Sequence, residues 1–368
     1  MSIVEFPAGS LRFLDELPRH APHDGFVWIY LERAEFAATL AEQQAAAQRL
    51  GGAALLDVHA RDLANEAHPS NFDATSVYDR VIFRRLATAQ EASAVAAQDA
   101  ADGRIDSRAV GFAVFDRLLI SVHPPGCPVA LGFIERLATD ARLSVDATAT
   151  RSRLPQGPAE LALQLINTMV DSYLELRKDL TRRLEDAQHV LLRPNPKSDT
   201  WPLLMRARQQ LHWLQELCEE QQDAMQEWLD TLREQPLSDW AADVDQAVRR
   251  RDALVARARD VMEHIDRVLH HARRLEQSAE TAVQIHFNAQ GQRTNDIMRT
   301  LTAITAVFLP LNLFTGFFGM NFDQLPLIHS GTGMWVALAL LGVVAVGILL
   351  LFWRRRYLSH AREDGPDS

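Results

Sequence analysis

A line of polar residues runs through an otherwise apolar segment near the end of this 368-residue chain. Asn295, Thr302 and Leu309 follow one another at intervals of seven, and Thr305 and Asn312 are also seven apart. Because a helix turns by about 100° per residue, a spacing of seven returns to nearly the same face. Amide and hydroxyl oxygens on one face could line an ion pathway, or they could join neighbouring helices. The pattern favours a pore-lining stripe, with helix-to-helix contact as the alternative.

A nearly uncharged stretch follows this stripe. The segment "FTGFFGMNFDQLPLIHSGTGMW", from Phe314 to Trp335, has Asp323 as its only charged residue, although the chain carries a formal net charge of −10. The location of this stretch depends on the two apolar segments that flank it.

The two flanking segments, 297–318 and 334–353, are each close to the ~20 residues that cross a bilayer. A buried core helix could explain one such run, but two in succession favour membrane spans. Arginines follow the second span and flank the start of the first, so the positive-inside rule places both termini in the cytoplasm and 319–333 outside. Two spans cannot enclose a pore, so a pathway would need several copies of the chain around a symmetry axis.

The rest of the chain divides into parts with different patterns. Residues 1–158 alternate β-forming and helical segments, which predicts a cytoplasmic α/β (α+β) domain with a mixed sheet and a hairpin turn at Asp116–Arg117. A helical hairpin is expected over 159–237, with one helix from about 159 to 192 and a second ending near Glu234. A tail, 354–368, follows the second span.

A stalk helix is expected over 238–296, with Ser238 as a candidate N-cap. Its apolar residues alternate at intervals of four and three, which is typical of a coiled-coil seam. The seam consists of Leu254, Ala258, Val261, Ile265, Val268, Ala272, Leu275, Ala279 and Ala282.

Several functions have little support. The chain has 13 histidines but no HExxH motif, and His264 and His271 lie two helical turns apart, so packing or surface roles are favoured over a zinc site. Ser121 and His123 lack a nucleophile elbow, so we expect no enzyme activity. The acidic balance argues against nucleic acid, and no phosphate-binding loop supports a nucleotide. Two distant cysteines fit a reducing compartment.

The end of the first span resembles the CorA family of magnesium and cobalt channels, whose signature is the tripeptide Gly319-Met320-Asn321. The segment "TNDIMRTLTAITAVFLPLNLFTGFFGMNF" is similar to the first span of that family throughout. "RDVMEHI", which contains Asp260 and Glu263, resembles the stalk segment that carries the family's regulatory cation site. The order of domains resembles that of the family over the whole chain.

The resemblance implies a homopentameric funnel in a bacterial inner (plasma) membrane, with the lipid bilayer and other copies of the chain as partners. Mg²⁺ (or Co²⁺) would enter along the membrane potential, and intracellular Mg²⁺ at Asp260 and Glu263 would close the channel. The tripeptide would select the ion: a ring of Asn321 amides would bind a hydrated cation weakly enough for release, which explains a neutral outer loop. Asn295 and Asn312 could form further polar rings, while Leu301 and Leu309 would form apolar constrictions that gate by dewetting.

Some residues depart from the family pattern. Leu327 stands where a second acidic residue is usual in the loop, and Asn312 stands where Thr is common. The loop sequence "IHSGTG" is partly similar to that of zinc transporters of the ZntB type, which are possibly proton-coupled, so Zn²⁺ transport is the alternative function. A signalling or scaffold protein whose spans serve only as anchors is a third hypothesis, disfavoured by the polar stripe.

Overall fold

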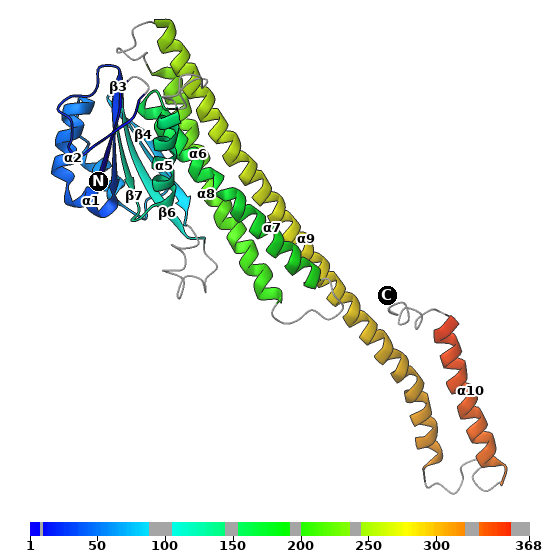
Figure 1. Ribbon diagram of the computed structural model, residues 1–368. Helices are drawn as coiled ribbons and strands as arrows, with labels where there is room; N and C mark the ends of the chain where they lie inside the picture. Colours follow the sequence, from blue (N-terminus) through cyan, green and yellow to red (C-terminus); the bar gives the residue numbers. More distant parts are fainter. Residues whose placement is uncertain are drawn as a thin grey trace. The chain divides into compact units, whose positions relative to one another are not determined.

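The structure is a computed structural model that describes residues 1–7, 10–87, 105–143, 154–191, 200–235, 244–320 and 331–354. Contacts between residues divide the chain into two units, Met1–Thr281 and Ala282–Ser368. Helix α9 (Val244–Phe318) contributes to both units. The ribbon is shown in Figure 1.

The first unit begins with a mixed seven-stranded sheet in the order β2-β1-β3-β7-β6-β5-β4. Among the described strands, β3 and β7 pair in parallel and the other neighbouring pairs are antiparallel. The predicted hairpin turn at Asp116–Arg117 is present between β6 and β7. The parallel pair beside the antiparallel pairs confirms the mixed sheet. The strands are β1 (Ser2–Pro7), β2 (Arg12–Leu14), β3 (Gly25–Glu32), β4 (Asn71–Ala74), β5 (Tyr78–Leu86), β6 (Ser107–Phe115) and β7 (Leu118–His123).

Side chains from both faces of the central strands are buried, which explains why β3 reads as a nearly continuous apolar run. On one face, Ile29 and Ile120 pack in a core with Phe36 and Leu63 from the covering helices. These covering helices are α1 (Arg33–Ala38), α2 (Leu40–Ala46), the short π-helix η1 (Ala47–Gly51) and α3 (Asp57–Ala64). The opposite face contacts α6 (Pro158–Asp171), which follows α5 (Pro128–Leu143).

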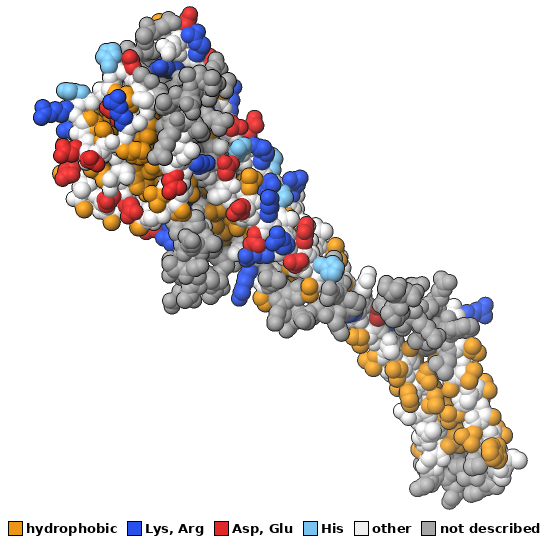
Figure 2. All heavy atoms as spheres, viewed as in Figure 1, with side chains coloured by type: hydrophobic (Ala, Val, Ile, Leu, Met, Phe, Trp, Pro, Cys, Tyr) orange, Lys and Arg blue, Asp and Glu red, His pale blue; other side chains and the backbone are white. Residues whose placement is uncertain are grey.

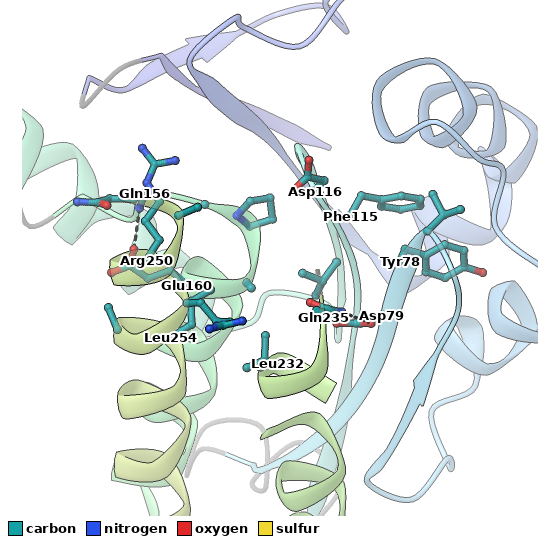
Figure 3. A pocket seen from close by; sticks show the side chains of 18 of the residues that line it. Tyr78, Asp79, Phe115, Asp116, Gln156, Glu160, Leu232, Gln235, Arg250 and Leu254 are labelled. Carbon is teal, nitrogen blue, oxygen red and sulfur yellow. Dashed lines mark hydrogen bonds between the residues drawn. The ribbon is translucent and has the colours of Figure 1, made fainter. Parts of the chain in front are cut away.

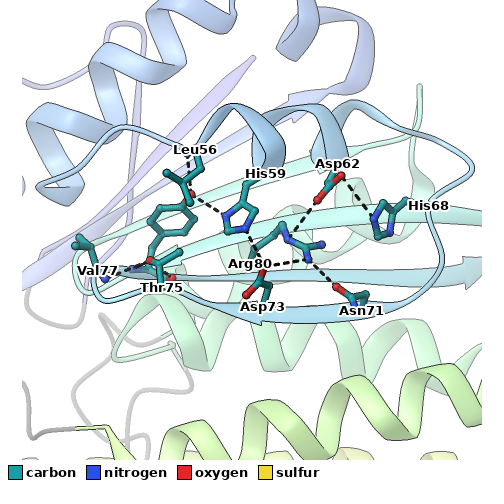
Figure 4. Close-up of polar contacts among 10 residues, drawn as sticks. Leu56, His59, Asp62, His68, Asn71, Asp73, Thr75, Val77 and Arg80 are labelled. Carbon is teal, nitrogen blue, oxygen red and sulfur yellow. Dashed lines mark hydrogen bonds and ion pairs between the residues drawn. The ribbon is translucent and has the colours of Figure 1, made fainter.

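A polar network holds α3 against β4 and β5 (Figure 4). The buried His59 ring lies between Tyr78 Oη, 2.8 Å from Nδ1, and Asp73 Oδ2, 3.1 Å from Nε2. Arg80, also buried, donates to Asn71 Oδ1 at 2.6 Å. His59 is therefore a hydrogen-bonded packing residue, in keeping with the interpretation of the histidines as structural.

The predicted first helix of the hairpin is interrupted. In the structure α6 ends at Asp171 and α7 (Tyr173–Leu191) begins two residues later. Ser172 between them keeps right-handed helical angles (φ −62°, ψ −22°), and its amide donates to the Met169 carbonyl at 3.2 Å, as in a 3₁₀ turn. The expected helix from about 159 to 192 is therefore present as two helices with a one-residue interruption. The second helix of the hairpin, α8 (Thr200–Glu234), ends where expected.

The predicted seam of α9 is buried within the first unit. Ala258, Val261, Ile265 and Ala279 have essentially no exposed surface. Polar contacts with α7 and α8 flank this seam: Thr181 Oγ1 lies 3.0 Å from His271 Nε2, and Arg273 donates to Glu219 at 2.6 Å. The seam is therefore covered by helices of the same chain, and the proposed Ser238 cap lies outside the described residues.

The second unit contains the end of α9 and helix α10 (Gly333–Arg354). Hydrophobic side chains dominate both segments in Figure 2. Among the described residues, one helix, α9, has the length and hydropathy to cross a membrane, and α10 contributes a shorter apolar stretch, Trp335–Ile348. The sheet, the 75-residue stalk helix and the second apolar helix confirm the predicted fold class.

Candidate functional site

The predicted pore-lining residues all lie on α9, and all of their side chains are exposed in this single chain. Leu301 is 58% exposed and Leu309 is 69% exposed, although both are large and apolar. Single exposed apolar side chains are ordinary, but a contiguous set such as that from Ile297 to Phe317 marks a surface that lipid or another protein covers. The polar members of the exposed set are Asn295, Thr302, Thr305 and Asn312.

A different face of the same helix segment is covered within the chain. Ala303 is buried, and Val307, Phe314 and Phe318 are half-buried. At about 100° per residue, these positions point about a quarter of a turn or more away from the stripe of Asn295, Thr302 and Leu309. The covered face and the polar stripe are thus separate, and no part of the described chain covers the stripe.

The hydroxyl hydrogens on the stripe are already used inside the helix. Thr302 Oγ1 donates to the Met298 carbonyl at 2.7 Å, and Thr305 Oγ1 donates to the Leu301 carbonyl at 2.8 Å. Each hydroxyl oxygen then retains lone pairs that point away from the helix axis as acceptors. Acceptors suit the outward-pointing hydrogens of the water around a cation.

The signature tripeptide begins where α9 ends. The Gly319 amide donates to the Thr315 carbonyl at 2.9 Å, and the Met320 amide lies 3.4 Å from the Phe317 carbonyl. A Cβ atom on Gly319 would lie 3.0 Å from the Thr315 oxygen, so this final turn favours glycine. Asn321 and Asp323 lie outside the described residues.

The predicted regulatory residues lie on the exposed side of the stalk. The Asp260 side chain is 62% exposed, and its Oδ1 is 3.8 Å from His264 Nε2. His264 Nδ1 lies 3.7 Å from Asp171 Oδ1 at the end of α6. Glu263 is exposed as well. Within the described residues of one chain, no group of three His, Cys, Asp or Glu side chains could hold a metal ion.

One buried carboxyl group was not anticipated. Asp79 on β5 accepts hydrogen bonds from Trp228 Nε1 at 3.2 Å and from Gln235 Nε2 at 3.0 Å. Desolvation raises the pKa of Asp79 to about 6, and the two hydrogen bonds offset part of that rise. The only signal in the sequence was a charged residue within an apolar strand segment.

Asp79 lines a cavity of about 590 Å³ in the first unit (Figure 3). The cavity lies between the sheet, the first turn of α6, the end of α8 and the start of α9. Its lining includes charges of both signs, among them Glu160 and Arg251. Glu160 Oε1 also accepts a hydrogen bond from Arg257 at 2.8 Å, so α6 and α9 are held together beside this cavity.

The fold defines a class: a large domain with a mixed sheet, joined to a long helix whose far end has the length and hydropathy to cross a membrane. The chain belongs to the CorA-like Mg²⁺ transporter family, whose model matches residues 24–356. Membership of this transporter family confirms the expectation that the chain is not an enzyme.

Individual relatives support the family assignment. The chain is 26% identical over 198 residues to the cobalt/magnesium transport protein CorA of Thermotoga maritima, covering 54% of this chain and 52% of that protein. It is 32% identical over 76 residues to the CorA protein of Methanocaldococcus jannaschii, covering 21% of this chain and 24% of the relative. The chain thus matches about half the length of the first relative and less of the second.

Solved structures show the same fold over nearly the whole chain. The complete CorA magnesium transporter of Methanocaldococcus jannaschii superimposes with a TM-score of 0.68 at 16% identity, covering 96% of this chain and 97% of that one. The full-length CmaX protein gives a TM-score of 0.57 at 20% identity with the same coverage.

Proposed function

We propose that this protein is a divalent cation channel that admits Mg²⁺, with Co²⁺ as a surrogate, through a homopentamer in the bacterial inner membrane. The observation that most supports this proposal is the exposed stripe of α9. It presents amide and hydroxyl oxygens on a face that the described chain does not cover. Oxygen ligands suit the hard cation Mg²⁺, whereas zinc prefers nitrogen and sulfur.

Asn321 is the proposed selectivity residue. Five Asn321 amides around an axis would accept hydrogen bonds from the water that Mg²⁺ gives up reluctantly. Gly319 permits the tight final turn that precedes this amide, because a side chain there would crowd the Thr315 carbonyl. Further inside, Asn312 and Asn295 would form polar rings, with Leu309 and Leu301 as hydrophobic constrictions.

The membrane potential supplies the driving force in this proposal. A divalent cation moving inward gains roughly 4.6 kcal/mol per 100 mV, which requires no nucleotide. Because this driving force would accumulate Mg²⁺ inside the cell, the channel needs a mechanism that closes it when internal Mg²⁺ is high. Asp260 and Glu263 are the proposed sensor of internal Mg²⁺. Mg²⁺ bound between subunits there would neutralise facing carboxylates and hold the channel closed; its loss would let like charges separate the stalks.

The function is tested by uptake into liposomes that contain the purified protein, with Mg²⁺, Co²⁺ and Zn²⁺ measured separately under an inside-negative potential. Asn321→Ala is expected to abolish uptake while the oligomer remains assembled. Gln324→Ala is the matched control, because it removes another loop amide three residues away. Wild-type rates in Asn321→Ala would contradict the selectivity role, and no uptake of any of the three ions by the parent protein would contradict the function.

A further inference from the structure

The cavity beside Asp79 belongs to the first unit and has no part in the proposed ion pathway. Its volume of about 590 Å³ is typical of pockets that bind small organic molecules. Leu232 at the end of α8 and Leu254 on α9 contribute to its apolar lining. In Figure 3, Arg250 and Leu254 on α9 lie on the opposite side of the cavity from Asp79 on β5. A ligand in the cavity would therefore meet charged groups from two different elements, with apolar side chains between them.

Asp79 supplies a negative charge that the protein does not balance. Its side chain is 4% exposed and accepts hydrogen bonds from Trp228 and Gln235, which are both neutral. Among the residues that the structure describes, none forms an ion pair with Asp79. A buried carboxylate without a nearby cation is costly, so a cationic group in the cavity would offset that cost.

Arg251 and the first turn of α6 supply positive charge to the same cavity. Arg251 lines the cavity from α9 and forms no ion pair with any described residue. Gly157, the N-cap of α6, also lines the cavity, and no side chain caps the first turn of the helix. The backbone N–H groups of an uncapped first turn carry partial positive charge. Together with the Arg251 guanidinium, they would attract an acidic group.

The other charged residues of the lining already have partners within the chain. Glu160 accepts hydrogen bonds from Arg257 and from the backbone amide of Gln156, both at 2.8 Å. Two further charged residues of the lining also have partners, Arg250 and Asp116. The charges that remain for a ligand are therefore one carboxylate, on Asp79, and one guanidinium, on Arg251.

We propose that this cavity binds a small organic zwitterion. The cationic group of the ligand lies beside the Asp79 carboxylate, and its acidic group lies beside Arg251 and the first turn of α6. The apolar side chains of the lining cover the carbon chain between the two groups. Such a ligand has no net charge, so it balances both charges of the cavity without adding a new one. The site does not depend on ion conduction, because all of its residues belong to the first unit.

Isothermal titration calorimetry tests this site on the full-length protein, purified in detergent at near-neutral pH. The probes are three linear amino acids, γ-aminobutyrate, ε-aminocaproate and ω-aminocaprylate. Each carries an ammonium group at one end and a carboxylate at the other, so the series samples different separations of the two charges. Caproate and hexylamine are the matched control ligands, because each has only one charged group.

We expect at least one of the three zwitterions to bind with a Kd of about 1 mM or tighter. Caproate and hexylamine should bind at least about tenfold more weakly, because each lacks one charge-assisted hydrogen bond. Asp79→Asn and Arg251→Gln should each weaken binding of the zwitterion by a similar factor. Arg249→Gln is the control variant and should leave binding unchanged, because Arg249 is an exposed arginine of the same helix that does not line the cavity.

Thermal unfolding of each variant shows whether it is folded, so a loss of binding can be assigned to the site. The absence of binding heat from all three zwitterions would overturn the inference. Unchanged affinity in either Asp79→Asn or Arg251→Gln would overturn it as well, as would caproate or hexylamine binding as tightly as the zwitterion. Because binding is measured directly, failure of the proposed ion channel would leave this result unaffected.

Discussion

The two halves of α9 differ in what covers them. Up to Thr281, the helix buries an apolar seam of Ala258, Val261 and Ile265 beneath helices of its own chain. Beyond Ala282, the helix leaves large apolar side chains such as Leu309 exposed beside a polar stripe. The first half is completed by intramolecular packing, whereas the second requires a surrounding that the single chain does not provide.

This difference separates residues that stabilise the fold from residues that we propose to serve transport. A seam residue such as Ile265 makes its contacts in one chain, so its loss should lower stability directly. A stripe residue such as Thr302 faces outward, and its hydroxyl donates only to its own helix. Its substitution should change ion passage and leave the fold intact.

The largest expected effect lies in the seam. Ile265→Ala should lower the free energy of unfolding by about 2–5 kcal/mol, because it removes buried methyl groups and leaves a cavity. Leu309→Ala, at an exposed position, should change it by less than about 0.5 kcal/mol in detergent. Chemical denaturation of both purified variants measures the contrast, and equal losses would remove the distinction between the two halves.

A pH-dependent effect of similar size is expected at Asp79. The pKa is about 6 in the folded chain against an ordinary value of 3.8, so this carboxyl favours the folded state while it is protonated. The protonated Asp79 side chain contributes to the free energy of unfolding in full below about pH 4. This contribution is lost as the pH rises toward 6. The difference in pKa corresponds to a loss of about 3 kcal/mol.

Asp79→Asn should therefore be more stable than the parent protein at pH 7 and closely similar at pH 4. The amide cannot ionise and keeps an acceptor for Trp228 or Gln235. Thermal unfolding at the two pH values tests this. A constant difference between the proteins across that range would show that the ionisation of Asp79 does not contribute.

A smaller effect is expected on gating. Asp260→Asn should weaken the protection of the stalk from proteolysis by Mg²⁺. A neutral amide attracts a bound cation less strongly than a carboxylate does, so the cation should bind more weakly. Asp252→Asn, at another exposed carboxyl of the same helix, is the control. Unchanged protection in Asp260→Asn would argue against the sensor, although Glu263 could reduce the size of the change.

The smallest expected effect concerns the end of α9. Gly319→Ala should lower Mg²⁺ uptake a few-fold, because the new Cβ would lie 3.0 Å from the Thr315 oxygen and disturb the turn before Asn321. Gly316→Ala is matched to it: a Cβ at that position would meet no atom of the described residues within 4 Å. Equal uptake in the two variants would show that the tight turn is not required.

The elements with a strong local period could be predicted from sequence. The four-and-three spacing around Val261 predicted the stalk helix, and the long apolar runs predicted the two apolar helical segments at the end of α9 and in α10. Features that depend on distant residues could not be predicted. The strand order and the environment of Asp79, whose partners Trp228 and Gln235 lie 149 and 156 residues away, depend on tertiary contacts.

The candidate site shows the same limit. The helical period predicted that Asn295, Thr302 and Leu309 share a face, and the structure places them on one exposed side of α9. The one-residue interruption at Ser172 was missed because helix boundaries at this scale depend on local turn geometry, which the apolar period does not specify. The assembly around the stripe depends on contacts between copies, which the period of one helix does not encode, so the pentamer remains a prediction.

The most direct test of the central claim compares Mg²⁺ and Zn²⁺ flux in liposomes, for the parent protein and for a variant with His286→Gln and His329→Gln. His286 lies on α9 outside the apolar span, with Nε2 3.1 Å from Gln290 Nε2, and His329 belongs to the outer loop. If oxygen ligands of the stripe and tripeptide carry the ion, Mg²⁺ flux should exceed Zn²⁺ flux and should be unchanged in the variant. A Zn²⁺ flux that exceeds Mg²⁺ flux in the parent and collapses in the variant would contradict the magnesium assignment and establish histidine-dependent zinc transport.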